Sequence, residues 1–182
     1  YGDGEDIEIA PPAPAEMIMP DIEEWVTLLD FNDTIGDENG NGNYVYPLAS
    51  DFAPGHGLFD ITNLKISQSS WNARFELTFA EMTDYWGLSN GFSHQIVQIY
   101  VDRGDYIWGE TDTLEGANVV IHDDWAWEMA ISATGEPGAV KSVDALSGET
   151  SAKGIEVSGD VNTKTVTITV SKMVIGDDVP NY

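Results

Sequence analysis

The stretch Trp71-Asn-Ala-Arg-Phe-Glu-Leu-Thr-Phe79 alternates apolar and polar side chains without a break. Successive side chains of a β-strand point to opposite faces of a sheet, so this period of two predicts a half-buried strand. The apolar row would lie in a core, and Trp71 belongs to that row. The charged and amide side chains between would face solvent.

Four further runs have strand character, at Trp25–Phe31, Phe92–Asp102, Trp125–Ile131 and Thr163–Ser171. Phe92–Asp102 is apolar on both faces, which is typical of a central strand. No segment has a convincing helical period, although residues 22–29 could form one or two turns. Many short strands separated by Gly-, Asn- and Ser-rich turns predict an all-β chain folded as an antiparallel β-sandwich or jelly roll.

Individual side chains can be placed from the same pattern. Trp125 and Trp127 fall on the apolar face of their run, which predicts core packing. Lys164 shares a row with Val166, opposite a row of threonines. Residues 23–182 would form one domain, because 182 residues with 42 % hydrophobic content are enough for a single core.

An acidic loop, Asp33–Asp60, carries the clearest metal-binding pattern, centred on Asp37-Glu-Asn-Gly-Asn-Gly42. Oxygen-bearing side chains recur at every second position and a glycine follows the third, as in the first half of an EF-hand loop. The twelfth position is Leu48 instead of Glu. The alternative is a Gly/Asn-rich hairpin loop without a metal. The side chains that we expect to hold calcium are Asp33, Asp37, Asn39, Asn41, Asn43 and Asp60.

A second cation site is possible where four carboxylates follow one another closely, and the alternative there is a solvated acidic loop. Its candidate ligands are Asp102, Asp105, Glu110 and Asp112.

The charge balance restricts the partners of the chain. Seven Lys and Arg stand against 32 Asp and Glu, which gives a net charge of −25. Such a surface disfavours nucleic acids and anionic membranes and favours cations. The absence of cysteine excludes disulfides and thiolate sites. No apolar run approaches transmembrane length, so we expect no membrane insertion. Because the chain starts at Tyr1 instead of Met, we expect a secreted, extracellular protein whose signal peptide was removed.

Catalysis is not indicated by any motif. Asp123-Asp124 is the best carboxylate pair, but an acidic turn that enters a core strand explains it better than a hydrolase site does. His56, His94 and His122 lack metal-ligand spacing and are expected to be hydrogen-bonded loop or strand residues. We therefore expect that the chain is not an enzyme.

Trp86 and Trp108 lie among glycines and polar residues. These two rings could be exposed to bind a sugar or a neighbouring subunit, and the sequence leaves both possibilities open.

Four blocks in order resemble a known module. They are Asp33-x-x-Gly36-Asp37-x-x-Gly40-x-Gly42-x-Tyr44-x-Tyr46-Pro47 with Phe52-x-Pro54-Gly55 and Phe59-Asp60-Ile61, then Trp86-Gly87-x-x-Asn90-Gly91-Phe92-Ser93-x-Gln95-x-x-Gln98-Ile99-Tyr100-Val101-Asp102, then Gly116-Ala117-Asn118-Val119, and finally Trp125-Ala126-Trp127-Glu128. Together they are similar to the DOMON-like C-terminal module of glucodextranases and archaeal amylopullulanases, over residues 30–178. The resemblance implies a β-sandwich with structural calcium. Thr34 and Glu38 depart from it, because the module commonly has Pro and Asp there.

A chain made of this module with a short N-terminal extension also resembles the cannula subunits of hyperthermophilic archaea. Those are extracellular proteins that polymerise into hollow tubes. The resemblance implies calcium-dependent assembly, in which an N-terminal strand of one subunit completes a sheet of another.

Residues 1–22 would supply that strand. Ile7 and Ile9 are two positions apart, the period that fills adjacent pockets of a sheet, and Pro11–Pro14 would act as a stiff spacer. The alternative is a solvated tail. The expected donor strand consists of Glu5, Asp6, Ile7, Glu8, Ile9 and Ala10.

The leading functional hypothesis is accordingly a structural subunit that self-associates head to tail into a calcium-dependent extracellular fibril. The alternative is a carbohydrate-binding or surface-attachment module of a secreted glycoside hydrolase.

Overall fold

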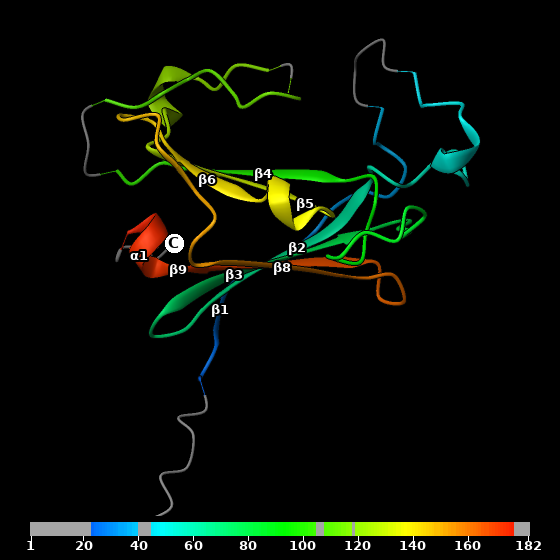
Figure 1. Cartoon of the computed structure of the whole chain (residues 1–182), viewed down its shortest axis with the longest axis horizontal. Helices are drawn as coiled ribbons and strands as arrows, with labels where there is room; N and C mark the ends of the chain where they lie inside the picture. The colour runs from blue at the N-terminus through cyan, green and yellow to red at the C-terminus, as the bar shows by residue number, and fades with distance from the viewer. Residues whose placement is uncertain (1–22, 40–44, 105–107, 118, 177–182) are drawn as a thin grey trace, which may run out of the picture.

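Two antiparallel sheets pack face to face in the computed structural model (Figure 1), which describes residues 23–39, 45–104, 108–117 and 119–176. The predicted β-sandwich is therefore confirmed. The predicted donor strand, residues 5–10, lies outside the described residues.

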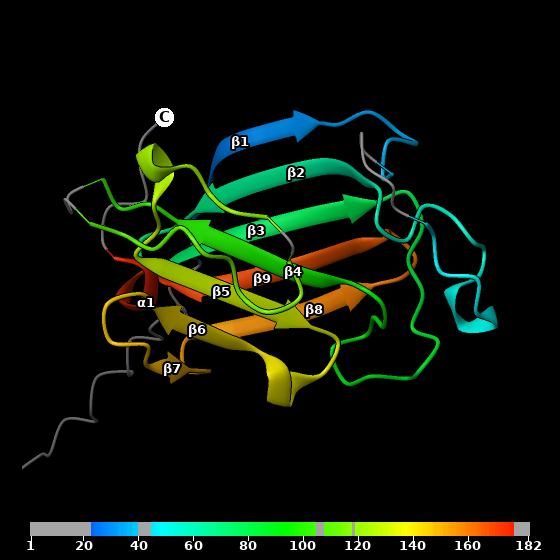
Figure 2. The same cartoon turned by 90° about the horizontal axis from the view of Figure 1, so that it is seen from above.

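One sheet has five strands in the order β1-β2-β3-β9-β8 and the other has four in the order β4-β5-β6-β7. Figure 2 shows the smaller sheet lying across the larger one. The bounds in the first sheet are β1 Val26–Asn32, β2 Ile61–Gln68, β3 Asn72–Phe79, β8 Ile155–Asp160 and β9 Thr165–Ser171. Those in the second are β4 Ile96–Val101, β5 Met129–Thr134, β6 Lys141–Asp144 and β7 Thr150–Ser151.

Short helical segments complete the described part of the chain, and none of its helices is long and apolar enough to cross a membrane. Helix α1 spans Lys172–Ile175, and 3-10 turns lie at Ser50–Phe52, Asp123–Trp125 and Pro137–Ala139.

The core forms between the apolar rows of β3 and β9 and the inner face of the second sheet. Phe75 pairs with Ile168 and Leu77 with Val166 across the β3–β9 ladder. Burying side chains of this size contributes about 1.5–3 kcal/mol each. The buried members of the cluster include Ala73, Phe75, Leu77, Phe79, Val97, Met129, Ile131, Ala133, Val166, Ile168 and Val170.

Trp71 was placed wrongly by the alternating pattern. The strand begins at Asn72, and the Trp71 side chain is 74 % exposed. The Ser69 hydroxyl oxygen accepts hydrogen bonds from the N–H groups of Trp71 and Asn72, at 3.2 and 2.9 Å, and so turns the chain before the strand starts. The expected period therefore holds only from residue 72 onward.

Phe92–Asp102 is not a central strand. Only Ile96–Val101 is extended, and this strand, β4, stands at an edge of its sheet, paired with β5 alone. Val97 of this strand packs into the core, and an apolar groove runs along the strand.

Three other expectations from the sequence are wrong or only partly confirmed. Trp125 lies in a 3-10 turn and is 63 % exposed, whereas Trp127 is buried as expected. Lys164 precedes β9 in a left-handed turn with φ of 56°, and its ammonium group reaches the Ala80 carbonyl oxygen at 2.6 Å. The helical alternative for residues 22–29 is wrong, because β1 begins at Val26.

Gly135 offers a test of the packing where β5 ends. A Cβ atom there would overlap the carbonyl oxygen of Phe92, while a Cβ at Gly138 would meet nothing within 4 Å. Gly135→Ala should lower the free energy of unfolding by about 1–3 kcal/mol, because the backbone must shift. Gly138→Ala, the matched control, should change it by less than about 0.5 kcal/mol. Urea denaturation measures both, and equal effects would contradict the packing described.

Candidate functional site

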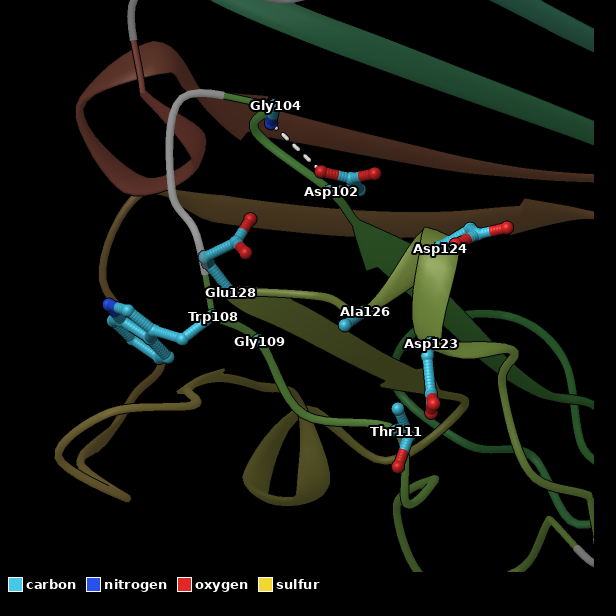
Figure 3. A pocket seen from close by; sticks show the side chains of 9 residues that line it. All are labelled: Asp102, Gly104, Trp108, Gly109, Thr111, Asp123, Asp124, Ala126 and Glu128. Atoms are coloured by element: carbon cyan, nitrogen blue, oxygen red, sulfur yellow. Dashed lines mark hydrogen bonds between the residues drawn. The ribbon is translucent and has the colours of Figure 1, made fainter.

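A cavity of about 450 Å³ lies beyond the end of β4, where three segments of the chain meet (Figure 3). The loop after β4, the segment 108–111 and the 3-10 turn Asp123–Trp125 surround it. The lining residues are Asp102, Gly104, Trp108, Gly109, Thr111, Asp123, Asp124, Ala126 and Glu128.

The floor of this pocket is backbone. Glu110 and Trp127 exchange two N–H···O=C hydrogen bonds of 2.9 Å, which hold the two segments side by side. A Cβ atom on Gly109 would lie 2.7 Å from the carbonyl carbon of Ala126, so only glycine permits this approach. Figure 3 shows Trp108 on one side of the floor and Asp123 on the other.

The carboxylates around the pocket differ in exposure and in the hydrogen bonds that they accept from the backbone. Glu128 is 4 % exposed, and its Oε2 accepts a hydrogen bond from the Arg103 N–H at 2.7 Å. Asp102 Oδ1 accepts from the Gly104 N–H at 2.8 Å. Asp123 and Asp124 are exposed on the turn. The pocket thus joins one aromatic ring to two carboxylates that accept backbone hydrogen bonds and two that are exposed, of which Asp124 lies 3.5 Å from His122 Nδ1.

The predicted second cation cluster is only partly brought together. Asp102 lines the pocket, Asp105 lies outside the described residues, and Glu110 and Asp112 are not in the lining. The N–H groups of Asp112 and Thr111 bond to Glu110 Oε1 and lower the pKa of that carboxyl. Over the ranges that the structure describes, no group of three or more metal-binding side chains occurs.

In the acidic loop, Asp60 is the one predicted ligand among the described residues that is buried. Its side chain is 2 % exposed, and Oδ2 accepts a hydrogen bond from the Gly36 N–H at 2.7 Å. Its Oδ1 is buried and has no hydrogen-bond partner there. Because a buried anionic oxygen without a donor or cation is costly, this oxygen fits a bound cation.

The other predicted ligands of this loop are exposed or lie outside the residues that the structure describes. Asp33, Asp37 and Asn39 are exposed, and Asn41 and Asn43 lie outside the described residues. The structure adds Glu38, whose carboxylate oxygens both accept from the Gly57 N–H at 2.8 and 2.9 Å. Glu38 therefore ties the loop to the segment that carries Asp60.

The aromatic side chains near His94 form a cluster before the start of β4, at the opposite end of this strand from the pocket. The His94 ring lies 4.6 Å from Trp86 and 4.7 Å from Phe52. Trp86 is 47 % exposed, whereas His94 is buried and its Nδ1 lies 3.2 Å from the Thr83 hydroxyl. His94 is thus the hydrogen-bonded histidine that the sequence predicted.

An apolar groove of about 640 Å³ lies between the two sheets along β4. Side chains from both faces of β4 line it, among them Val97, Gln98 and Ile99, so it follows the strand's outer edge. Leu28 and Leu29 of β1 also line the groove, as do Ile121 and Trp125. Sequence reasoning missed this groove, and the clue available was the apolar character of both faces of β4.

A comparison with protein families gives one match. The model of a family described as the C-terminal binding module, SLH-like, of glucodextranase matches residues 28–182. The chain belongs to this family. The match spans both sheets, the acidic loop and the pocket, and it confirms the predicted likeness to the glucodextranase module. No curated protein matches the chain.

Proposed function

We propose that this chain is a non-catalytic module that attaches to a neutral polysaccharide through the pocket at Trp108. The observation that carries the proposal is the pairing of a partly exposed indole ring with carboxylates over a backbone floor. The family's description as a binding module supports the proposal and supports an extracellular or cell-surface location.

Sugar chemistry suits this arrangement. A pyranose ring has an apolar C–H face, which can pack on an aromatic ring, and a rim of hydroxyl groups. Those hydroxyls can donate hydrogen bonds to Asp123, Asp124 and Thr111, which act as acceptors. The carboxylates and the net charge of −25 would repel an anionic polymer, so the expected ligand is neutral.

Affinity electrophoresis in gels that contain dextran tests this function. Trp108→Ala should weaken binding at least about tenfold, equivalent to about 1.4 kcal/mol, because the stacking surface is lost. Trp71→Ala is the matched control, since Trp71 is exposed but lies outside the pocket. Migration of the parent chain that dextran and soluble starch leave unchanged would contradict the proposal.

We further propose that the acidic loop binds calcium at Asp60. Calcium prefers about six to eight oxygen ligands, and the buried, unpartnered Oδ1 of Asp60 offers one. Asp37 and Asn39 in the same loop carry further oxygens. Calcium would also offset the self-repulsion of a chain with a net charge of −25.

Asp60→Asn tests the calcium site with little change in shape. In the parent chain, calcium at a hundredfold excess over its dissociation constant should stabilise the fold by about 2.7 kcal/mol. The variant should lose most of that gain, which thermal unfolding with and without calcium measures. An equal rise in melting temperature in both proteins would refute the site.

A second candidate function is self-assembly through the apolar groove along β4. Within the described residues the outer edge of β4 has no strand beside it, and an edge of this kind can accept a strand from another chain. Ile7 and Ile9 have the spacing to enter such a groove. Donation in one direction would make a head-to-tail contact, which propagates into rings or filaments.

Deletion of residues 1–10 tests the second candidate. If Ile7 and Ile9 enter the groove of a neighbour, the full chain should form polymers with calcium, and the shortened chain should remain a folded monomer. Electron microscopy and sedimentation distinguish the two forms. Polymers of equal length and rate from the shortened chain would contradict assembly by this segment.

A further inference from the structure

Gln95 is a buried amide of the second resembling block, and the sequence did not place it among the expected metal ligands. It directly precedes β4 and is 3 % exposed. Its Nε2 donates a hydrogen bond to the Leu58 carbonyl oxygen at 2.7 Å, which fixes the plane of the amide. Its Oε1 is buried and has no hydrogen-bond partner among the described residues.

Asp60 lies two residues beyond Leu58, and its Oδ1 is also buried without a hydrogen-bond partner among the described residues. Gln95 is therefore hydrogen-bonded to the stretch 58–60, which contains Asp60. Each of these two residues has a buried oxygen without a hydrogen-bond partner among the described residues. Buried acceptors are almost always satisfied, so each of these two oxygens requires a partner that the described residues do not supply.

Two backbone donors of this stretch and one nearby ammonium group already have other hydrogen-bond partners. The Asp60 N–H bonds to Gly57 O at 3.4 Å, and the Leu58 N–H bonds to the Tyr46 hydroxyl at 3.3 Å. The Lys164 ammonium group, which lies nearby at the Ala80 carbonyl oxygen, pairs with Glu81 at 3.2 Å. None of these three donors is therefore bonded to Asp60 Oδ1 or Gln95 Oε1.

We propose that Gln95 Oε1 is a ligand of the cation that Asp60 binds. A carboxylate and an amide carbonyl are oxygen donors of the kind that calcium combines in proteins. The inference rests on the calcium site proposed above and adds a ligand from outside the acidic loop.

The consequence is a link between the two sheets. Asp60 directly precedes β2 of the five-stranded sheet, and Gln95 directly precedes β4 of the four-stranded sheet. A cation held by both side chains would fasten the sheets to each other at the end that carries the acidic loop. Calcium would then stabilise the sandwich itself and not only the loop.

Gln95→Met and Gln95→Glu test the proposal by calorimetric titration with calcium chloride. Methionine keeps the length of the side chain but offers no hard oxygen, so the dissociation constant should rise about tenfold or more. Glutamate adds a charge and should lower the dissociation constant below that of the parent. Gln98→Met is the matched control, because the Gln98 amide already bonds to Glu115 O and to the Tyr100 hydroxyl. This variant should bind calcium as the parent does.

The outcomes separate the two proposals. If the parent and Asp60→Asn both fail to bind calcium, the site and the role of Gln95 are both wrong. If Asp60→Asn loses binding and Gln95→Met does not, only the role of Gln95 is wrong, and an ordered water satisfies its oxygen instead. Should Gln95→Met fail to fold in chelator, weaker calcium binding by Gln95→Glu than by the parent would overturn the proposal.

Discussion

The contact between the apolar rows of β3 and β9 and the inner face of β4 and β5 is the interaction on which the molecule depends. Phe75, Leu77 and Ile168 are buried there, opposite Val97 and Ile131. Since every second side chain of a strand reaches this layer, a strand cannot shift its pairing with its neighbour by one residue without turning its whole apolar row away from the core. The fixed register determines where each strand ends and hence where the connecting loops leave the sandwich.

The functional features lie at opposite ends of β4. The pocket of Trp108 and Glu128 follows Val101, whereas Gln95 and the acidic loop with Asp60 lie before Ile96. The strand thus separates the proposed sugar-binding pocket from the two buried oxygens of the proposed cation site. The proposed cation would stabilise the scaffold from one end while the other end remains open to a polymer.

The period-two pattern predicted β3 and β9 because the backbone of a strand alone decides which face a side chain takes. It failed at Trp71, because the Ser69 hydroxyl forms a turn that delays the strand. It failed at Trp125 because the His122 ring accepts a hydrogen bond from the Asp124 N–H and begins a 3-10 turn. Such side-chain contacts with nearby backbone leave the hydrophobic pattern unchanged.

The candidate sites also differ in how far the sequence predicts their residues. Asp60 was predicted, because clustered oxygens are visible in the sequence. Gln95 was not, because it meets Leu58 from 37 positions away. The pocket likewise depends on the pairing of Glu110 with Trp127, which brings Trp108 toward Glu128 without any local signal.

Titration of ¹⁵N-labelled protein with a short neutral α-glucan, followed by NMR, tests the attachment function most directly. We expect the NMR signals of the Trp108 indole N–H and of the backbone N–H groups of Thr111 and residues 123–128 to shift together and saturate. Trp86 and the acidic loop should stay unchanged. Shifts confined to Trp86 and its neighbours, or no shifts at all, would contradict the assignment of binding to this pocket.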